Sequence, residues 1–176
     1  MRNRRQQRSR PRRPAGFRLD LIRLAFEFCR KAAEIKGVER IGMIGSITTT
    51  EQNPKDIDLV VTIGTNADMG ILAKVGRQLQ GRAQGLSSGA DIFLVNDKQE
   101  YLGRVCHYSD CRPWIRASCQ ALNCGRNQYI CDDLDSIRLD SDVVAHPPVV
   151  LYPQIIIQTQ LPEDLSDALA HAKLHI

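Results

Sequence analysis

The 176-residue sequence has few aromatic residues and no long apolar run. Phe, Trp and Tyr together make up 5% of the chain, with a single Trp. No stretch approaches the roughly 18 consecutive apolar residues that a membrane-spanning helix needs. Acids and arginines also interrupt the first apolar segment, so no signal-peptide core follows the basic start. These absences predict a soluble, cytoplasmic protein without membrane contact.

Two common phosphate-binding motifs are missing, because neither a Walker A sequence nor G-x-G-x-x-G occurs. The segment 85–89 reads GLSSG and matches the G-x-S-x-G pattern of hydrolases. That pattern requires a strand before the serine and a helix after it. Here the expected helix lies before the segment and the expected strand after it. The match therefore does not predict a nucleophilic serine.

Acidic residues are absent from the start of the chain. Residues 1–18 contain eight Arg and no Asp or Glu; without these eight, 16 Lys and Arg stand against 20 Asp and Glu. The net charge of +4 therefore belongs to a tail, and the body has a charge of −4. This composition predicts a disordered tail, either a linker or an arm for nucleic acid or an acidic partner. A transit peptide is a third interpretation, although two prolines argue against its amphipathic helix.

The first hundred residues alternate between helical and strand patterns. Apolar spacing predicts a helix over 20–38, with Asp20 as its cap and Gly37 at its end. A second helix is expected over 69–80, and short β-branched or apolar runs predict strands over 40–44, 56–63 and 90–95. This order predicts an α/β or α+β fold whose sheet is covered on one side.

The remainder of the chain has a different character. Residues 101–131 are rich in Cys and show no clear periodicity, strands are expected at 136–139 and 143–151, and a terminal helix at 164–174. We therefore divide the chain into a disordered tail at 1–18, a core at 19–100 and a Cys-rich extension at 101–176.

Four cysteines of the extension form two pairs with equal spacing, Cys106 with Cys111 and Cys119 with Cys124. Disulfides are rare in the cytoplasm, and structural zinc prefers four soft ligands from paired short spacings. The pattern is compatible with a structural Zn²⁺. The alternative is a set of small buried thiols that pack a loop-rich region.

Three carboxylates carry the clearest chemical signal. Side chains alternate along a strand, so Asp56 and Asp58 point to the same face while Ile57 points into the core. Asp91 opens the next strong strand and could lie beside them. Such oxygen ligands suit Mg²⁺ or Mn²⁺, and three of them can hold two metals for an in-line phosphoryl displacement.

Gly45 and Ser46 end the strand that precedes this pair. Glycine permits a sharp turn and close approach of a phosphate, and free N–H groups at the start of a helical turn favour an anion. The serine hydroxyl can bind a phosphate oxygen. Together with the carboxylates, this turn indicates a nucleoside triphosphate (NTP) as ligand.

The combination of IGMIGS at 41–46, KDIDLVV at 55–61 and ADIFLV at 90–95 resembles the polymerase-β-type nucleotidyltransferase superfamily. The resemblance covers about residues 38–97. It implies a mixed sheet with helices on one face. It also implies transfer of a nucleoside monophosphate from an NTP such as ATP to an acceptor, with release of pyrophosphate.

By this resemblance Asp56 and Asp58 would bind both metals, and Asp91 would complete the second metal site and help to activate the acceptor. Gly45 and Ser46 would hold the triphosphate.

The sequence departs from the family pattern after Gly-Ser, where many small members carry a basic residue and this chain has Thr48, Thr49 and Thr50. Positive charge for the triphosphate would have to come from elsewhere; the candidates are Lys55, Lys74 and Arg104.

Two functions follow as hypotheses. The first is a nucleotidyltransferase that acts on an unidentified protein, small molecule or nucleic acid. The second is an inactive binding module with the same fold, which contacts nucleic acid or a partner protein through the Arg-rich tail and the Cys-rich region. The three facing carboxylates favour the enzyme, and the absence of a basic residue after Ser46 favours the binding module.

Overall fold

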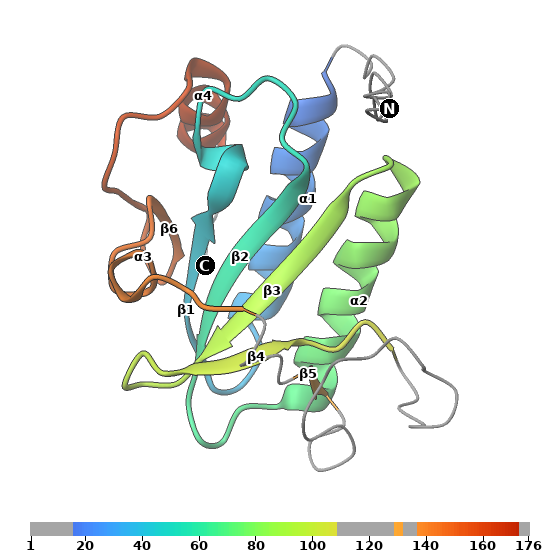
Figure 1. Ribbon diagram of the computed structural model, residues 1–176, viewed down its shortest axis with the longest axis vertical. Helices are drawn as coiled ribbons and strands as arrows, with labels where there is room; N and C mark the ends of the chain where they lie inside the picture. Colours follow the sequence, from blue (N-terminus) through green and yellow to red (C-terminus); the bar gives the residue numbers. More distant parts are fainter. Residues whose placement is uncertain (1–15, 109–128, 132–136, 173–176) are drawn as a thin grey trace, which may run out of the picture.

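Residues 16–108, 129–131 and 137–172 are described by a computed structural model of the chain (Figure 1). Over these ranges no helix is both long and apolar enough to cross a lipid bilayer. The regular elements, in chain order, are α1 (Phe17–Ala33), β1 (Val38–Ile44), the 3₁₀ turn η1 (Gly45–Thr48), β2 (Asp56–Ile63), α2 (Met69–Gly85), β3 (Gly89–Val95), β4 (Tyr101–Val105), β5 (Ile130–Cys131), α3 (Ser141–Ala145), β6 (Val149–Tyr152), β7 (Ile156–Ile157) and α4 (Glu163–His171).

The strands form one seven-stranded sheet in the order β5-β4-β3-β2-β1-β6-β7. β2 and β3 are parallel, and the other neighbouring strands are antiparallel. Parallel neighbours need a crossover connection, which α2 provides between β2 and β3. The expectation of an α+β fold is confirmed, and its sheet is mixed. Strands from both sides of residue 100 join this one sheet.

One face of the sheet packs against α1 and α2, which lie behind it in Figure 1. Alternate side chains of the two central strands point to this face because strand side chains alternate with a period of two. They are almost completely buried, and comprise Ile57, Leu59, Val61, Ala90, Ile92 and Leu94. α4 contacts α1 and extends the same helical layer.

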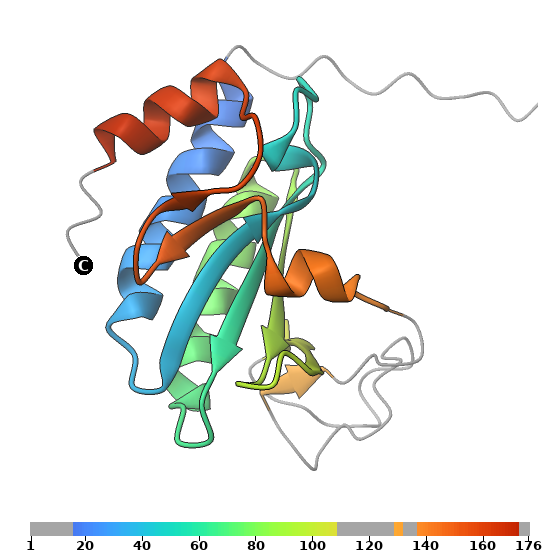
Figure 2. The same ribbon diagram turned by 90° about the vertical axis from the view of Figure 1, so that its left-hand side faces the viewer.

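The opposite face is partly covered by α3, which Figure 2 shows on the far side of the sheet from α1 and α4. Val144 of this helix packs in a second apolar cluster with Ile44, Val60, Phe93 and Val95. The Arg40 guanidinium on β1 donates hydrogen bonds to the carbonyls of Val144 and Ala145, at the C-terminal end of α3. The expectation that helices lie on one face only is therefore wrong for α3.

The first helix begins earlier than the sequence predicts. α1 starts at Phe17, after Gly16 with φ 85°, and not at Asp20. The aromatic ring of Phe17 is 4% exposed and Arg18 is 7% exposed, so tertiary packing extends the helix towards the tail. Arg18 therefore belongs to the folded body, and the remainder of the predicted tail, residues 1–15, lies outside the described residues.

The second half of the chain differs most from expectation. Residues 137–140 form no strand, and the segment expected as a strand over 143–151 contains the end of α3 and most of β6. The Asp140 carboxylate accepts a hydrogen bond from the Asp142 N–H and so caps α3. β4, β5 and β7 were not predicted. β5 and β7 are two residues long, and such strands take their conformation from the neighbour with which they pair.

Two glycines of α2 differ in their surroundings: Gly76 faces the sheet closely, whereas Gly81 faces open space. Substitutions at the two positions therefore test how tightly this helix packs on the sheet. A Cβ added at Gly76 would lie 2.8 Å from Ile92 Cδ1 and 2.9 Å from Val105 Cγ1, whereas at Gly81 it would meet nothing within 4 Å. Both substitutions to Ala gain the same helix propensity. We expect Gly81→Ala to raise the free energy of unfolding by about 0.5–1 kcal/mol, and Gly76→Ala to lower it by about 1 kcal/mol through overpacking. Urea denaturation measures both, and equal changes would contradict this packing.

Candidate active site

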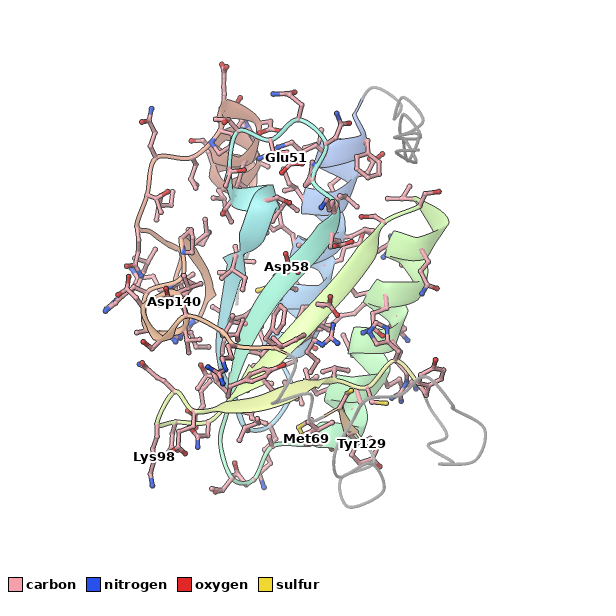
Figure 3. All side chains as sticks on the ribbon, in the orientation of Figure 1. Glu51, Asp58, Met69, Lys98, Tyr129 and Asp140 are labelled. Carbon is pink, nitrogen blue, oxygen red and sulfur yellow. The ribbon has the colours of Figure 1, made fainter. Side chains whose placement is uncertain are left out.

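Asp58 and Asp91 lie side by side on the sheet face opposite α1 and α2. They are register partners on the parallel strands β2 and β3. The neighbours of Asp58 along the strand, Ile57 and Leu59, point to the helices and have no exposed surface. Asp58 therefore points to the other face, where both carboxylates are half-buried (Figure 3). The geometry brings two negative charges together at the middle of the sheet.

Gly45 brings the backbone of the η1 turn against Asp58. Its φ is 74°, and a Cβ added to it would lie 2.3 Å from Asp58 Oδ2. A side chain at position 45 would be strained twice, by the left-handed backbone and by the carboxylate. Glycine at this position therefore allows the main chain to pass the carboxylate at close range.

The threonines that follow Gly-Ser stabilise the turn itself. Thr48 Oγ1 donates a hydrogen bond to the Gly45 carbonyl at 2.8 Å, and Thr49 Oγ1 donates to the Ser46 carbonyl at 2.9 Å. The Thr49 N–H also donates to the Ser46 carbonyl at 3.1 Å. Where the family resemblance implies a basic residue, this chain has hydroxyls that close a 3₁₀ turn.

Asp56 lies on the same face of the sheet as Asp58, but its carboxylate is hydrogen-bonded to the start of β3. Its Oδ1 accepts a hydrogen bond from the Gly89 N–H at 3.1 Å, and Gly89 is its register partner on β3. A Cβ at Gly89 would lie 2.6 Å from that oxygen, so glycine is again the residue that fits. The structure thus pairs Asp58 with Asp91 and places Asp56 against the start of β3.

An arginine and a histidine lie beside Asp91. Arg104 Nη1 on β4 is 2.7 Å from Asp91 Oδ1, and His107 Nε2 is 3.6 Å from the same oxygen. Burial raises the pKa of Asp91, but the hydrogen bond with His107 and the charge of Arg104 outweigh it and hold that pKa below its usual value. From the sequence, Arg104 was only a candidate source of positive charge. Its ion pair with Asp91 was not predicted, because the β4 strand that carries Arg104 was not predicted.

Asp58 has the opposite electrostatic character. Burial raises its pKa to about 6, and the negative charges of Asp91 and then Asp56 act in the same direction, against the weaker effect of Arg104. At neutral pH the folded protein therefore holds an ionised carboxylate in an unfavourable position. A cation at this position would relieve that repulsion.

The Asp58 and Asp91 carboxylates could hold a hard divalent cation only if a substrate supplied further oxygen ligands. Among the described residues, no three His, Cys, Asp or Glu side chains form a group that could hold a metal ion. Mg²⁺ commonly uses one or two carboxylates together with substrate phosphates and water. The in-register oxygens of Asp58 and Asp91, beside the open backbone of Gly45, match that kind of partial site.

Other predicted residues lie apart from this pair or outside the described ranges. Lys74 is on α2, which covers the opposite face of the sheet, and therefore cannot supply charge at the carboxylates. Lys55 is exposed just before β2. Cys106 is buried. The other expected zinc ligands, Cys111, Cys119 and Cys124, lie outside the described residues, so a zinc site stays a prediction.

Comparisons of this chain with models of known protein families, with curated proteins and with solved structures find no match. Membership of the nucleotidyltransferase superfamily therefore stays a prediction. The function has to be argued from the geometry of the site.

The raised pKa of Asp58 predicts a pH-dependent effect of Asp58→Asn. Because folding raises this pKa above the ordinary value of 3.8, the contribution of Asp58 to stability falls as pH rises from about 4 to about 6, and the amide variant lacks this pH-dependent loss. We expect Asp58→Asn to raise the free energy of unfolding by about 1–2 kcal/mol at pH 7.5 in EDTA, with little effect at pH 4. Urea denaturation at both values measures this.

The matched control is Asp97→Asn in the exposed connection between β3 and β4, which we expect to change stability by less than about 0.5 kcal/mol. A less stable Asp58→Asn protein at pH 7.5 would contradict the electrostatic description of the pair.

Proposed function

We propose that the chain is a divalent-metal-dependent nucleotidyltransferase that uses an NTP as donor. The observation that carries this proposal is the in-register pair of Asp58 and Asp91 beside the η1 turn. Burial and the negative charge of Asp91 make the ionised form of Asp58 unfavourable in this fold, and a bound cation would relieve that cost. An oxygen-rich partial site next to a glycine backbone suits a cation that arrives with phosphate groups.

In this proposal Asp58 and Asp91 would hold Mg²⁺ or Mn²⁺, together with phosphate oxygens of the substrate; Asp56, which the sequence suggested as a further ligand, instead accepts a hydrogen bond from the Gly89 N–H. The bound cation supplies positive charge to the triphosphate and to the leaving pyrophosphate. The backbone at Gly45 and the hydroxyl of Ser46 bind phosphate oxygens. The hydrogen bond with His107 and the charge of Arg104 hold the pKa of Asp91 below its usual value, so this carboxylate is ionised at neutral pH.

The reaction is an in-line displacement at the α-phosphorus. An acceptor oxygen forms a bond to that phosphorus, the bond from phosphorus to the bridging oxygen breaks, and pyrophosphate leaves with the electron pair. The proton of the acceptor hydroxyl passes to Asp91 as general base. Residues 137–145 pack over Val60 and Phe93 next to the carboxylates, so the C-terminal half of the chain shapes the acceptor side.

A second candidate is a binding module without catalysis. The specific observation in its favour is that Arg104 and His107 already compensate the charge of Asp91. The site could then be a structural ion-pair cluster, and the seven Arg within residues 1–15 would contact nucleic acid or an acidic partner.

NTP binding measured by calorimetry tests the first proposal. We expect the wild type to bind ATP or another NTP only with Mg²⁺ or Mn²⁺, and Asp58→Asn to weaken that binding at least about tenfold, because a charged metal ligand is lost. Asp97→Asn should bind as the wild type does. Since Asp58→Asn is expected to be the more stable protein, lost binding could not be attributed to unfolding. Metal-dependent binding that survives in Asp58→Asn would refute the site.

Nucleic-acid binding tests the second candidate. We compare the full chain with one that begins at Gly16, since Phe17 and Arg18 belong to α1. If the tail binds phosphates, affinity for a labelled single-stranded oligonucleotide should fall about 100-fold or more between 50 and 200 mM salt and be lost without residues 1–15. Fluorescence anisotropy gives both values. Equal binding by the shortened chain would exclude the tail as the contact.

A further inference from the structure

Arg18 is the one charged side chain that is buried among the described residues, with 7% of its surface exposed. It lies in the first turn of α1, where the positive end of the helix dipole disfavours a cation. Local helix chemistry therefore does not explain its position. The explanation has to come from the groups that it contacts.

The guanidinium binds three groups from two other segments. Nη2 donates to the Ile47 carbonyl at 2.8 Å, Nη1 donates to the Glu51 carbonyl at 2.7 Å, and Nε donates to Asp164 Oδ2 at 2.7 Å. Ile47 belongs to η1, and Glu51, labelled in Figure 3, lies in the loop from η1 to β2. Asp164 is in the first turn of α4. One side chain thus joins α1, the loop and the C-terminal helix.

These contacts order a segment that has little regular structure of its own. Residues 49–55 between η1 and β2 belong to no helix or strand, so their carbonyls have no ladder partners and need others where they are shielded from water. The Arg18 guanidinium satisfies the Ile47 carbonyl of η1 and the Glu51 carbonyl of the loop at once, and the ion pair with Asp164 balances its buried charge. The side chain of Ile47 is completely buried in the apolar core, and this burial also anchors the η1 turn.

We propose that Arg18 is a positioning residue that holds residues 45–51, hereafter the 45–51 turn, in the conformation that binds the triphosphate. The inference rests on the proposed function, because it assigns the turn that role. Arg18 does not touch the phosphates; it fixes the carbonyls on one side of the turn so that the backbone at Gly45 and Ser46 keeps its place beside Asp58. The contact with Asp164 makes the position of α4 part of the same arrangement.

The test compares Arg18→Lys with Arg23→Lys. Arg23 lies on the same helix but is exposed and paired only with Asp20 at 3.2 Å, so its replacement is a matched control. Lysine keeps the charge at position 18 but cannot reach two carbonyls with a fork. We expect Arg18→Lys to weaken ATP binding in Mn²⁺ about tenfold, as the binding-competent turn becomes less populated. Binding of Mn²⁺ alone should stay within about twofold, and Arg23→Lys should match the wild type.

A third variant separates the carbonyl contacts from general loosening of the fold. Asp164→Asn removes the charge partner on α4 but leaves the bonds to Ile47 and Glu51, so we expect less than about threefold weaker ATP binding. If Asp164→Asn weakens ATP binding as much as Arg18→Lys does, or if Arg18→Lys weakens Mn²⁺ and ATP binding equally, the inference is overturned.

Hydrogen exchange distinguishes failure of this inference from failure of the proposed function. The exchange rate of the Thr49 amide, which donates to the Ser46 carbonyl, reports on the order of the turn. This measurement needs no nucleotide. We expect exchange at least about tenfold faster in Arg18→Lys than in the wild type, and unchanged in Arg23→Lys. Unchanged exchange in Arg18→Lys would overturn the positioning of the turn. No ATP binding by the wild type would overturn the proposed function and, with it, the role of the turn in nucleotide binding.

Discussion

Asp58 and Asp91 are register partners on the parallel strands β2 and β3, and burial together with their mutual repulsion makes the ionised form of Asp58 unfavourable. Arg104 and His107 compensate Asp91, whereas Asp58 keeps a pKa of about 6 and remains the less favourable charge. Because residue 45 is glycine, the backbone of the η1 turn can approach the Asp58 carboxylate closely. The ionised Asp58 side chain lowers the stability of the fold, and a cation bound by both acids would remove that cost.

The helical layer creates this arrangement from the other side of the sheet. α2 crosses between β2 and β3 and makes them parallel, which sets the two acids in the same register position. α1 and α2 together bury the alternate residues of both strands. α1 also carries Arg18, whose contacts fix the loop after η1 and the start of α4. The site therefore depends on packing at a distance as well as on its own residues.

The two candidate functions place different requirements on the charges of Asp58 and Asp91. A nucleotidyltransferase needs carboxylates that a cation and a triphosphate can bridge. Asp58 meets that need because, within the described part of the chain, no cationic side chain forms an ion pair with it as Arg104 does with Asp91. A binding module needs only a stable scaffold, for which the Asp91 ion pair is sufficient. The unrelieved charge on Asp58 is the reason that we place the enzyme first.

The sequence by itself determined the local elements of the core. Short β-branched and apolar runs predicted β2 and β3, and the apolar spacing predicted α2. The period of two along a strand predicted a common face for Asp56 and Asp58, with Asp91 on a strand that could lie beside them. Only the tertiary structure decided what surrounds them. The β4 strand that carries Arg104, the α3 helix on the second face and the burial of Arg18 depend on partners distant in sequence, and residues 1–18 read alone indicate only a charged tail. Periodicity records which side of a strand or helix is apolar, whereas ion pairs and short strands arise from packing between segments that no local pattern contains.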